Sequence, residues 1–263
     1  MEGSRRSRGP NISDSGIILR YQKLGESDRI LRILTKEHGK RSAVAKGVRK
    51  PKSSFGARLE PFTCSRLLLY EGRNMDIVRQ AEIEVSFHEL RQDLELFTRA
   101  SAMSELIDKI TVEHDPHPEL FSLLLKGFEL LKNKAGQLDF ILSFFEYRVL
   151  AESGLGLRVG ECANCGGSYS RGSFSLKLGG FVCANCRDSI DVGKIVTVSD
   201  VASETLRWMS ENELGSFPEE LDESVIREIS FLMEKVMEHW LEREFRSHRT
   251  IREVSHLYGK NKN

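Results

Sequence analysis

Four of the five cysteines in this chain lie in two Cys-x-x-Cys pairs that are separated by 17 residues. In each pair a tight turn can direct two sulfur atoms toward one ion, and two such pairs complete a tetrahedron of thiolates. The spacing falls within the range of structural zinc sites. We therefore predict one structural Zn²⁺ ion, bound by Cys162, Cys165, Cys183 and Cys186.

Disulfides, a redox-active dithiol and a catalytic metal centre are the alternative uses of these thiols. Disulfides would leave Cys64 over, and the start MEGSRRSRGP lacks the apolar core of an export signal. A thioredoxin-like dithiol needs a βαβ setting, which the surrounding pattern does not provide. A catalytic zinc usually keeps one position open and has histidine nearby, but residues 161–186 contain no histidine. Four thiolates fill the tetrahedral coordination shell of a zinc ion, which favours a structural ion over a catalytic one.

The chain around the cysteines predicts a zinc ribbon over residues 161–190. Gly166 and Gly167 follow the first pair, where the backbone must curl around the ion, and SFSLKLGGFVC is typical of a short hairpin. The fifth cysteine, Cys64, alternates with apolar neighbours in a predicted strand. We expect it to be buried and to have no chemical role.

Motifs of catalysis are absent from the sequence. It contains no Gly-rich phosphate loop ending in Gly-Lys-Ser/Thr, no Gly-x-Ser-x-Gly elbow and no His-Glu-x-x-His helix. The stretch HDPHP at residues 114–118 could be half of a metal site, but it fits a loop between helices with an Asp cap better. We therefore expect a binding protein and not an enzyme.

The charges are divided unevenly along the chain, although 39 Lys and Arg balance 39 Asp and Glu overall. Residues 1–80 hold 18 basic and 8 acidic residues, which leaves 21 basic and 31 acidic residues for the remainder. Such a division predicts that the basic part meets a polyanion. The alternative is that the difference reflects ordinary solvated surfaces.

Five short segments with strand periodicity precede residue 88, namely GIILRYQ, RILRILT, KRSAVAKGV, PFTCSRLLLY and MDIVRQAEIEV. Tight turns join most of them, and a longer loop with Pro51 separates the third from the fourth. Five strands with one irregular loop predict an OB-fold barrel over residues 14–87, although an SH3-like barrel would give a similar pattern. We predict residues 1–13 to be a disordered arm.

Helical periodicity replaces strand periodicity after Phe87, and the predicted fold class is therefore α+β. A helical domain is expected over residues 88–160 and 191–263, interrupted by the ribbon. Its first helix should bury Leu94, Phe97, Ala100, Met103 or Ser104 and Ile107, and the helix from Pro118 should stop at Gly136. Residues 138–154 are apolar on nearly every side, which predicts a buried helix whose aromatics belong to the core.

The densest positive stretch is KRSAVAKGVRKPKSSFGAR, on the third predicted strand and the loop after it. Lysine and arginine side chains along one side of a barrel would contact phosphates, and aromatic side chains nearby could stack on bases. Among the aromatics, Phe55 in the polar loop is the best candidate for exposure. The predicted DNA-binding residues are Lys40, Arg41, Lys46, Arg49, Lys50, Lys52, Phe55 and Arg58.

The chain resembles the RecO family of bacterial recombination mediators. The resemblance rests on DSGIILRYQKLGESDRILRILTKEHGKRSAVAKGVRKPKS, on RLEPFTCSRLLLYEGRNMDIV and on an all-helical remainder that the four-cysteine segment interrupts. One departure is GGSYSRGSFSLKLGG, which is polar and glycine-rich where the family often has a more apolar ribbon. Together the order and spacing of these pieces are specific, and they cover nearly the whole length.

The resemblance implies a non-enzymatic protein that binds single- and double-stranded DNA and anneals complementary strands. It also implies help in loading the recombinase RecA onto DNA coated by single-strand binding protein. RecR and the C-terminal tail of single-strand binding protein are the implied direct partners. A cytoplasmic, nucleoid-associated location without a membrane follows, since no apolar run reaches the roughly 18 residues of a membrane span.

Two other functions stay open on the sequence. One is a zinc-dependent nucleic-acid enzyme, such as a nuclease or deaminase, in which the cysteine site has a catalytic role. The other is an RNA-binding or ribosome-associated protein that combines an OB-fold with a zinc ribbon.

Overall fold

The computed structural model describes residues 11–133, 137–169, 172–190, 194–219, 221–241, 250, 251 and 254. The first ten residues of the predicted arm and the predicted stop at Gly136 therefore lie outside the described residues. The chain forms two compact units. The first contains the described residues up to Arg91 together with Asp108–Phe121, and the second contains the other described residues from Gln92 on.

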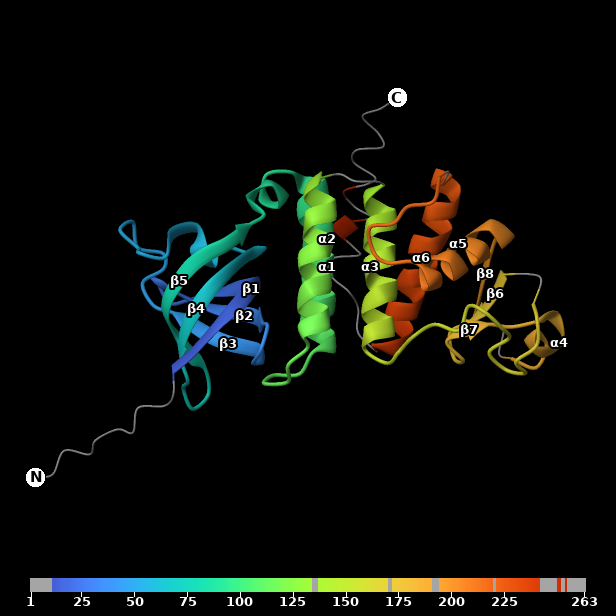
Figure 1. Cartoon of the computed structure of the whole chain (residues 1–263), viewed down its shortest axis with the longest axis horizontal. Helices are drawn as coiled ribbons and strands as arrows, with labels where there is room; N and C mark the ends of the chain where they lie inside the picture. Colours follow the sequence, from blue (N-terminus) through green and yellow to red (C-terminus); the bar gives the residue numbers. More distant parts are fainter. Residues whose placement is uncertain are drawn as a thin grey trace, which may run out of the picture. The chain divides into compact units, whose positions relative to one another are not determined.

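The first unit is a five-stranded closed barrel with the strand order β1-β2-β3-β5-β4 (Figure 1). All its pairs are antiparallel except β3 with β5, which are parallel and joined at only two positions, Ala43 opposite Asp76 and Val44 opposite Ile77. This barrel confirms the predicted OB-fold. The strands are β1 (Asn11–Leu24), β2 (Asp28–Thr35), β3 (Gly39–Ala45), β4 (Thr63–Tyr70) and β5 (Asp76–Ser86).

The first strand begins earlier than predicted. Asn11 and Ile12 already pair with Tyr70 and Leu69 of β4, and Ile12 is buried in the barrel core. Residues 11–13 therefore belong to the barrel and not to a disordered arm, because burial of one apolar side chain and the ladder hydrogen bonds hold them in place.

Alternating apolar side chains fill the barrel, among them Leu31 and Ile33 from β2 and Leu67 and Leu69 from β4. Cys64 is buried as predicted, and desolvation raises the pKa of its thiol to about 12. The long loop after β3 contains a short 3₁₀ turn, η1 (Gly56–Leu59), and another, η2 (His88–Arg91), follows β5.

A segment from between the first two helices packs on the barrel. It joins α1 (Leu94–Ile110) to α2 (Pro118–Asn133), and the backbone N–H of His114 donates to the carbonyl of Lys40 at 3.0 Å. Gly39 has a φ of +69°, and a Cβ there would lie 2.3 Å from the carbonyl oxygen of Asp115. The predicted interhelix loop is confirmed, but its docking on the barrel follows from no local pattern.

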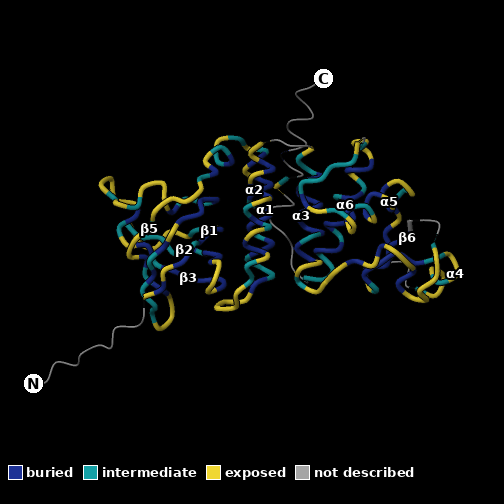
Figure 2. Tube along the Cα trace, in the orientation of Figure 1, coloured by how far each residue is buried: buried dark blue, intermediate teal, exposed yellow. Residues whose placement is uncertain are grey.

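The second unit contains α3 (Leu138–Glu152), α5 (Asp200–Glu211) and α6 (Glu223–Trp240) as well as most of α1 and α2. Helix α3 is buried along almost its whole length, which confirms the prediction (Figure 2). The predicted face of α1 is partly wrong, since Leu94 and Phe97 are 46% and 40% exposed. Leu96 is buried in their place, together with the predicted Ala100 and Met103.

The cysteine segment of the second unit forms a three-stranded sheet in the order β7-β6-β8. Its strands are β6 (Gly172–Ser175), β7 (Gly180–Phe181) and β8 (Ile195–Val198), and a short helix, α4 (Ala184–Arg187), follows β7. The β6–β7 pair is the predicted hairpin. The sheet extends beyond the predicted limit at residue 190, because β8 pairs with the other edge of β6. Despite the polar sequence, Phe174 and Phe181 are fully buried in an edge-to-face contact.

Candidate metal centre and nucleic-acid interface

The four predicted cysteines converge on one point. Their sulfur atoms all lie within 4.8 Å of one another, and the sulfurs of Cys165 and Cys183 are 3.9 Å apart. A tetrahedral site with Zn–S bonds near 2.3 Å requires sulfur–sulfur separations of about 3.8 Å. The cluster therefore fits a four-thiolate metal site.

Two local turns bring the sulfurs together. The first pair lies in a turn in which the N–H of Gly166 donates to the carbonyl of Cys162 at 2.9 Å. The second pair surrounds the start of α4, where the N–H of Cys186 donates to the carbonyl of Cys183 at 3.1 Å. The N–H of Cys183 also points at the sulfur of Cys162, at 3.3 Å. Hydrogen bonds of this kind stabilise thiolates.

Two thiols of the cluster, those of Cys162 and Cys186, have pKa values that are shifted in opposite directions. Burial by itself would raise the pKa of Cys162, but backbone N–H groups, that of Cys183 foremost, lower it to about 6. The Asn164 amide by itself would lower the pKa of Cys186, but the neighbouring sulfurs raise it to about 11. A second negative charge is therefore unfavourable beside the first unless a cation compensates it.

Within the described part of the chain, this cluster is the one group of three or more potential ligands that could hold a metal ion. It contains neither histidine nor carboxylate. Four thiolates leave no open position for a water or substrate, so the arrangement suits a structural ion.

Two of the predicted DNA-binding residues are buried. Lys40 is 7% exposed, and its ammonium group contacts the backbone carbonyl of Asp108 and lies 3.3 Å from the carboxylate of that residue. Arg41 is 3% exposed and forms a two-pronged ion pair with Asp76, at 2.7 and 3.1 Å. The expectation that both side chains lie on an open surface is wrong. Strand alternation and the docked 108–121 segment enclose them.

The environment of Arg41 keeps the side chain charged. Burial alone would lower the pKa of the guanidinium, but hydrogen bonds to Asp76 and Glu71 raise it above its usual value. A contact with His114 completes the enclosure. The carboxylates of Asp76 and Glu71 already neutralise the charge of the Arg41 guanidinium. The role of Arg41 is therefore to stabilise the barrel and not to bind phosphate.

Acidic groups of the docked segment also neutralise the outer face of β1 and β2. Arg20 pairs with Asp108 at 2.7 Å, and Arg32 pairs with Glu113, which also accepts a hydrogen bond from Ser42 at 2.6 Å. These pairs reduce the positive charge on that face of the barrel.

The other predicted basic residues lie in the long loop after β3, residues 46–58, which we call the basic loop. Their side chains are exposed, and they are Lys46, Arg49, Lys50, Lys52 and Arg58. Backbone contacts shape the loop, because the N–H of Arg49 donates to Ser27 at 2.9 Å and the guanidinium of Arg58 donates to the carbonyl of Ser54 at 2.7 Å. Phe55 is half-buried and packs against the barrel core.

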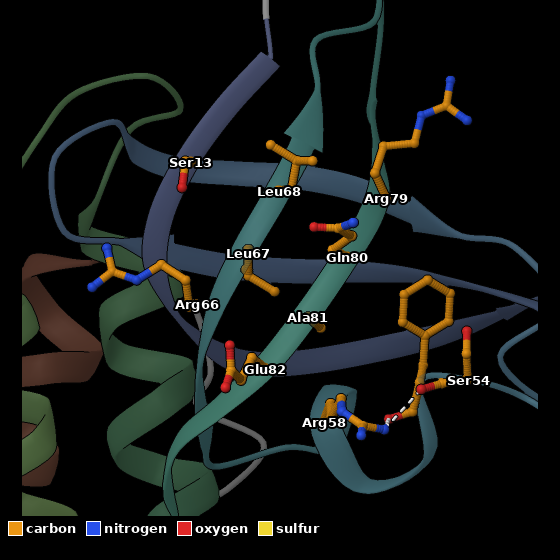
Figure 3. A pocket seen from close by; sticks show the side chains of 11 residues that line it. Ser13, Ser54, Arg58, Arg66, Leu67, Leu68, Arg79, Gln80, Ala81 and Glu82 are labelled. Carbon is orange, nitrogen blue, oxygen red and sulfur yellow. Dashed lines mark hydrogen bonds between the residues drawn. The ribbon is translucent and has the colours of Figure 1, made fainter.

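A pocket adjoins the basic loop (Figure 3). Loop residues form one side of it, and β4 and β5 contribute Arg66, Arg79, Gln80 and Glu82, which the sequence reasoning did not select. Arg66 is exposed between two buried residues of β4, whereas Arg79, Gln80 and Glu82 lie in a mostly exposed run of β5 that gives no periodic signal. Only the fold shows that they lie beside the loop.

Comparison with protein families identifies the chain. A model described as recombination protein O N terminal matches residues 10–87, and a model described as recombination protein O C terminal matches residues 91–249. The chain belongs to the RecO family. This assignment confirms the resemblance on which the sequence interpretation relied.

Individual RecO proteins are similar in sequence to this chain over most of their length. The chain is 36% identical to the DNA repair protein RecO of Bifidobacterium adolescentis over 251 residues, which cover 92% of this chain and 99% of that protein. It is 40% identical to the DNA repair protein RecO of Cutibacterium acnes over 186 residues, or 68% and 75% of the two chains. RecO is thus a DNA repair and recombination family. No described helix is both long enough and apolar enough to cross a membrane.

Proposed function

We propose that this RecO-family protein is a recombination mediator that binds DNA through the basic loop and anneals complementary strands. The observation that carries the proposal is the exposed set of cations on the loop, whereas Arg20 and Arg32 on the outer face of β1 and β2 are already paired with carboxylates. Two DNA strands repel each other, and a basic surface that holds both phosphate chains lowers this repulsion while the bases stay free to pair. No catalytic group is needed for that step.

The same proposal assigns the partners and the metal. RecR and the C-terminal tail of single-strand binding protein bind directly, and the protein thereby helps to load RecA onto single-stranded DNA. The acidic part of the chain after residue 80 would dock proteins without competing for DNA. Zn²⁺ is the ion that best suits four thiolates, and it would hold the ribbon sheet together. Binding to DNA would place the protein at the nucleoid in the cytoplasm.

The test is a triple substitution, Arg49→Ala with Lys50→Ala and Lys52→Ala. Each lost phosphate contact should reduce the salt dependence of single-strand binding by about 0.7 in the log–log slope, so that the slope falls by about 2. Annealing of complementary oligonucleotides at moderate salt should slow in parallel. The measurement is fluorescence anisotropy across a salt series, with metal analysis of the same sample.

The matched control removes three exposed cations of the helical unit, Lys126, Lys132 and Arg227, by alanine substitution. The control changes the net charge equally but should leave binding and annealing intact. Normal annealing by the basic-loop variant would refute the proposal. Preference for RNA over DNA in competition, or turnover of either nucleic acid, would favour the alternative functions.

A further inference from the structure

The pocket beside the basic loop has the size and lining of a ligand site. Its volume is about 520 Å³, within the range of roughly 300–1,000 Å³ that is usual for small-molecule pockets. Arg58 belongs both to the basic loop and to the pocket wall, so the two surfaces are continuous. A DNA strand held by the loop would therefore pass the pocket.

Two polar side chains of the pocket have unused hydrogen-bonding capacity. Gln80 and Glu82 are two residues apart on β5, so they emerge on the same face of the strand. Neither has a hydrogen-bond or ion-pair partner among the residues that the structure describes. The amide of Gln80 can donate and accept, whereas the carboxylate of Glu82 only accepts. Such a pair suits the edge of a base that carries an amino group.

The arginines at the rim differ in availability. Arg66 forms an ion pair with Glu84 at 2.8 Å, and Arg58 is engaged with the loop backbone. Arg79 faces the Tyr70 ring at 5.2 Å and has no carboxylate partner within the described ranges. In Figure 3, the side chains of Arg79 and Gln80 extend from β5 in different directions, so a phosphate could bind to Arg79 while a base bonds to Gln80.

An aromatic side chain completes the lining. Phe55 is half-buried, its inner side packs against the barrel core, and its accessible side faces the pocket. A ring anchored in this way loses little freedom when a base stacks on it, and a base in a duplex cannot reach such a ring.

We propose that this pocket binds one unstacked nucleotide of single-stranded DNA, preferably one whose base carries an exocyclic amino group. The base stacks on Phe55 and bonds to Gln80 and Glu82, and its phosphate meets Arg79. This subsite rests on the proposed function and adds contact with a base to the phosphate contacts of the basic loop.

The test compares oligo-dC, oligo-dT and a duplex of equal length as probes of the full chain. The wild type should bind oligo-dC more tightly than oligo-dT. The variant with Gln80→Ala and Glu82→Gln should lose affinity for oligo-dC by about fivefold or more, while its affinity for the duplex stays within about twofold. Glu82→Gln removes a negative charge, so electrostatics alone would strengthen DNA binding, and a loss cannot come from that source.

The matched control carries Gln22→Ala and Glu37→Gln, an exposed glutamine and an exposed glutamate elsewhere on the barrel. An oligonucleotide that contains 5-iododeoxycytidine should crosslink to Phe55 on irradiation. Mass spectrometry of the digested complex would locate the crosslinked residue. Equal binding of oligo-dC and oligo-dT by the wild type, or unchanged oligo-dC affinity in the pocket variant, would overturn the subsite while DNA binding stands. If the wild type binds none of the three probes, the proposed function itself is wrong.

Discussion

Replacing Arg41 separates a role in stability from a role in DNA binding. Arg41 and Asp76 are each 4% exposed in their side chains and are joined at 2.7 Å, so Arg41→Ala would leave a carboxylate buried without its counter-charge. Breaking a buried pair in this way typically costs about 3–5 kcal/mol. Glu71 is 37% exposed and can be solvated, so it adds little to this cost.

The assay is hydrogen exchange of peptides from β3 and β5, because both tryptophans of the chain lie outside the barrel unit. A loss of about 3 kcal/mol should accelerate exchange there by about 100-fold or more. The variant with Arg41→Met and Asp76→Leu should recover much of the protection, since it leaves no buried charge. Arg49→Ala is the control, which should weaken DNA binding without faster exchange. If Arg41→Ala weakens DNA binding and leaves exchange unchanged, Arg41 is a DNA contact and our account of the barrel is wrong.

Three further outcomes test other parts of the structure. Removal of the metal by a chelator, or Cys183→Ser, should increase proteolysis within residues 157–198 and leave the barrel protected; unchanged cleavage would contradict a structural ion. Gly179→Ala should destabilise the second unit by about 1–3 kcal/mol and shift tryptophan emission, because φ is +65° and a Cβ would lie 2.3 Å from the Trp240 ring; an unshifted spectrum would contradict this contact. A hydrogen bond from Ser42 and the charge of Arg32 lower the pKa of the Glu113 carboxyl in the folded protein. The contribution of Glu113 to stability is therefore present above its pKa in the unfolded chain and is lost as the pH falls through its pKa in the folded protein. Glu113→Gln should therefore flatten the acid dependence of exchange in β3, and an unaltered dependence would argue against this ion pair.

The cysteine site was predictable because its ligands lie close together in the sequence. One short turn places each pair, and a shared site requires only that the two turns meet, so spacing alone predicted that Cys162, Cys165, Cys183 and Cys186 cluster. The third strand of the ribbon was missed, since β8 pairs with β6 across an interval that carries no local signal.

The barrel was predictable for a similar reason. Alternating apolar residues mark each strand, and the helix α3 is apolar all round, so both elements are specified by their own periodicity. The exposure of Leu94 and Phe97 on α1 could not be predicted in this way. A periodic pattern shows that a helix has an apolar face, but it does not show which residues near the end of the helix are covered by neighbouring elements.

The sequence by itself determined the family, the barrel, the four-cysteine cluster and the cluster of basic residues. Only the tertiary structure decided which cations remain available, because the partners of Lys40 and Arg41 lie far from them in the chain, in the 108–121 segment and at the start of β5. The same holds for Arg79, Gln80 and Glu82, which strand pairing and the returning loop bring beside Phe55. Charge is a property of composition, but its availability depends on long-range contacts that periodicity does not encode.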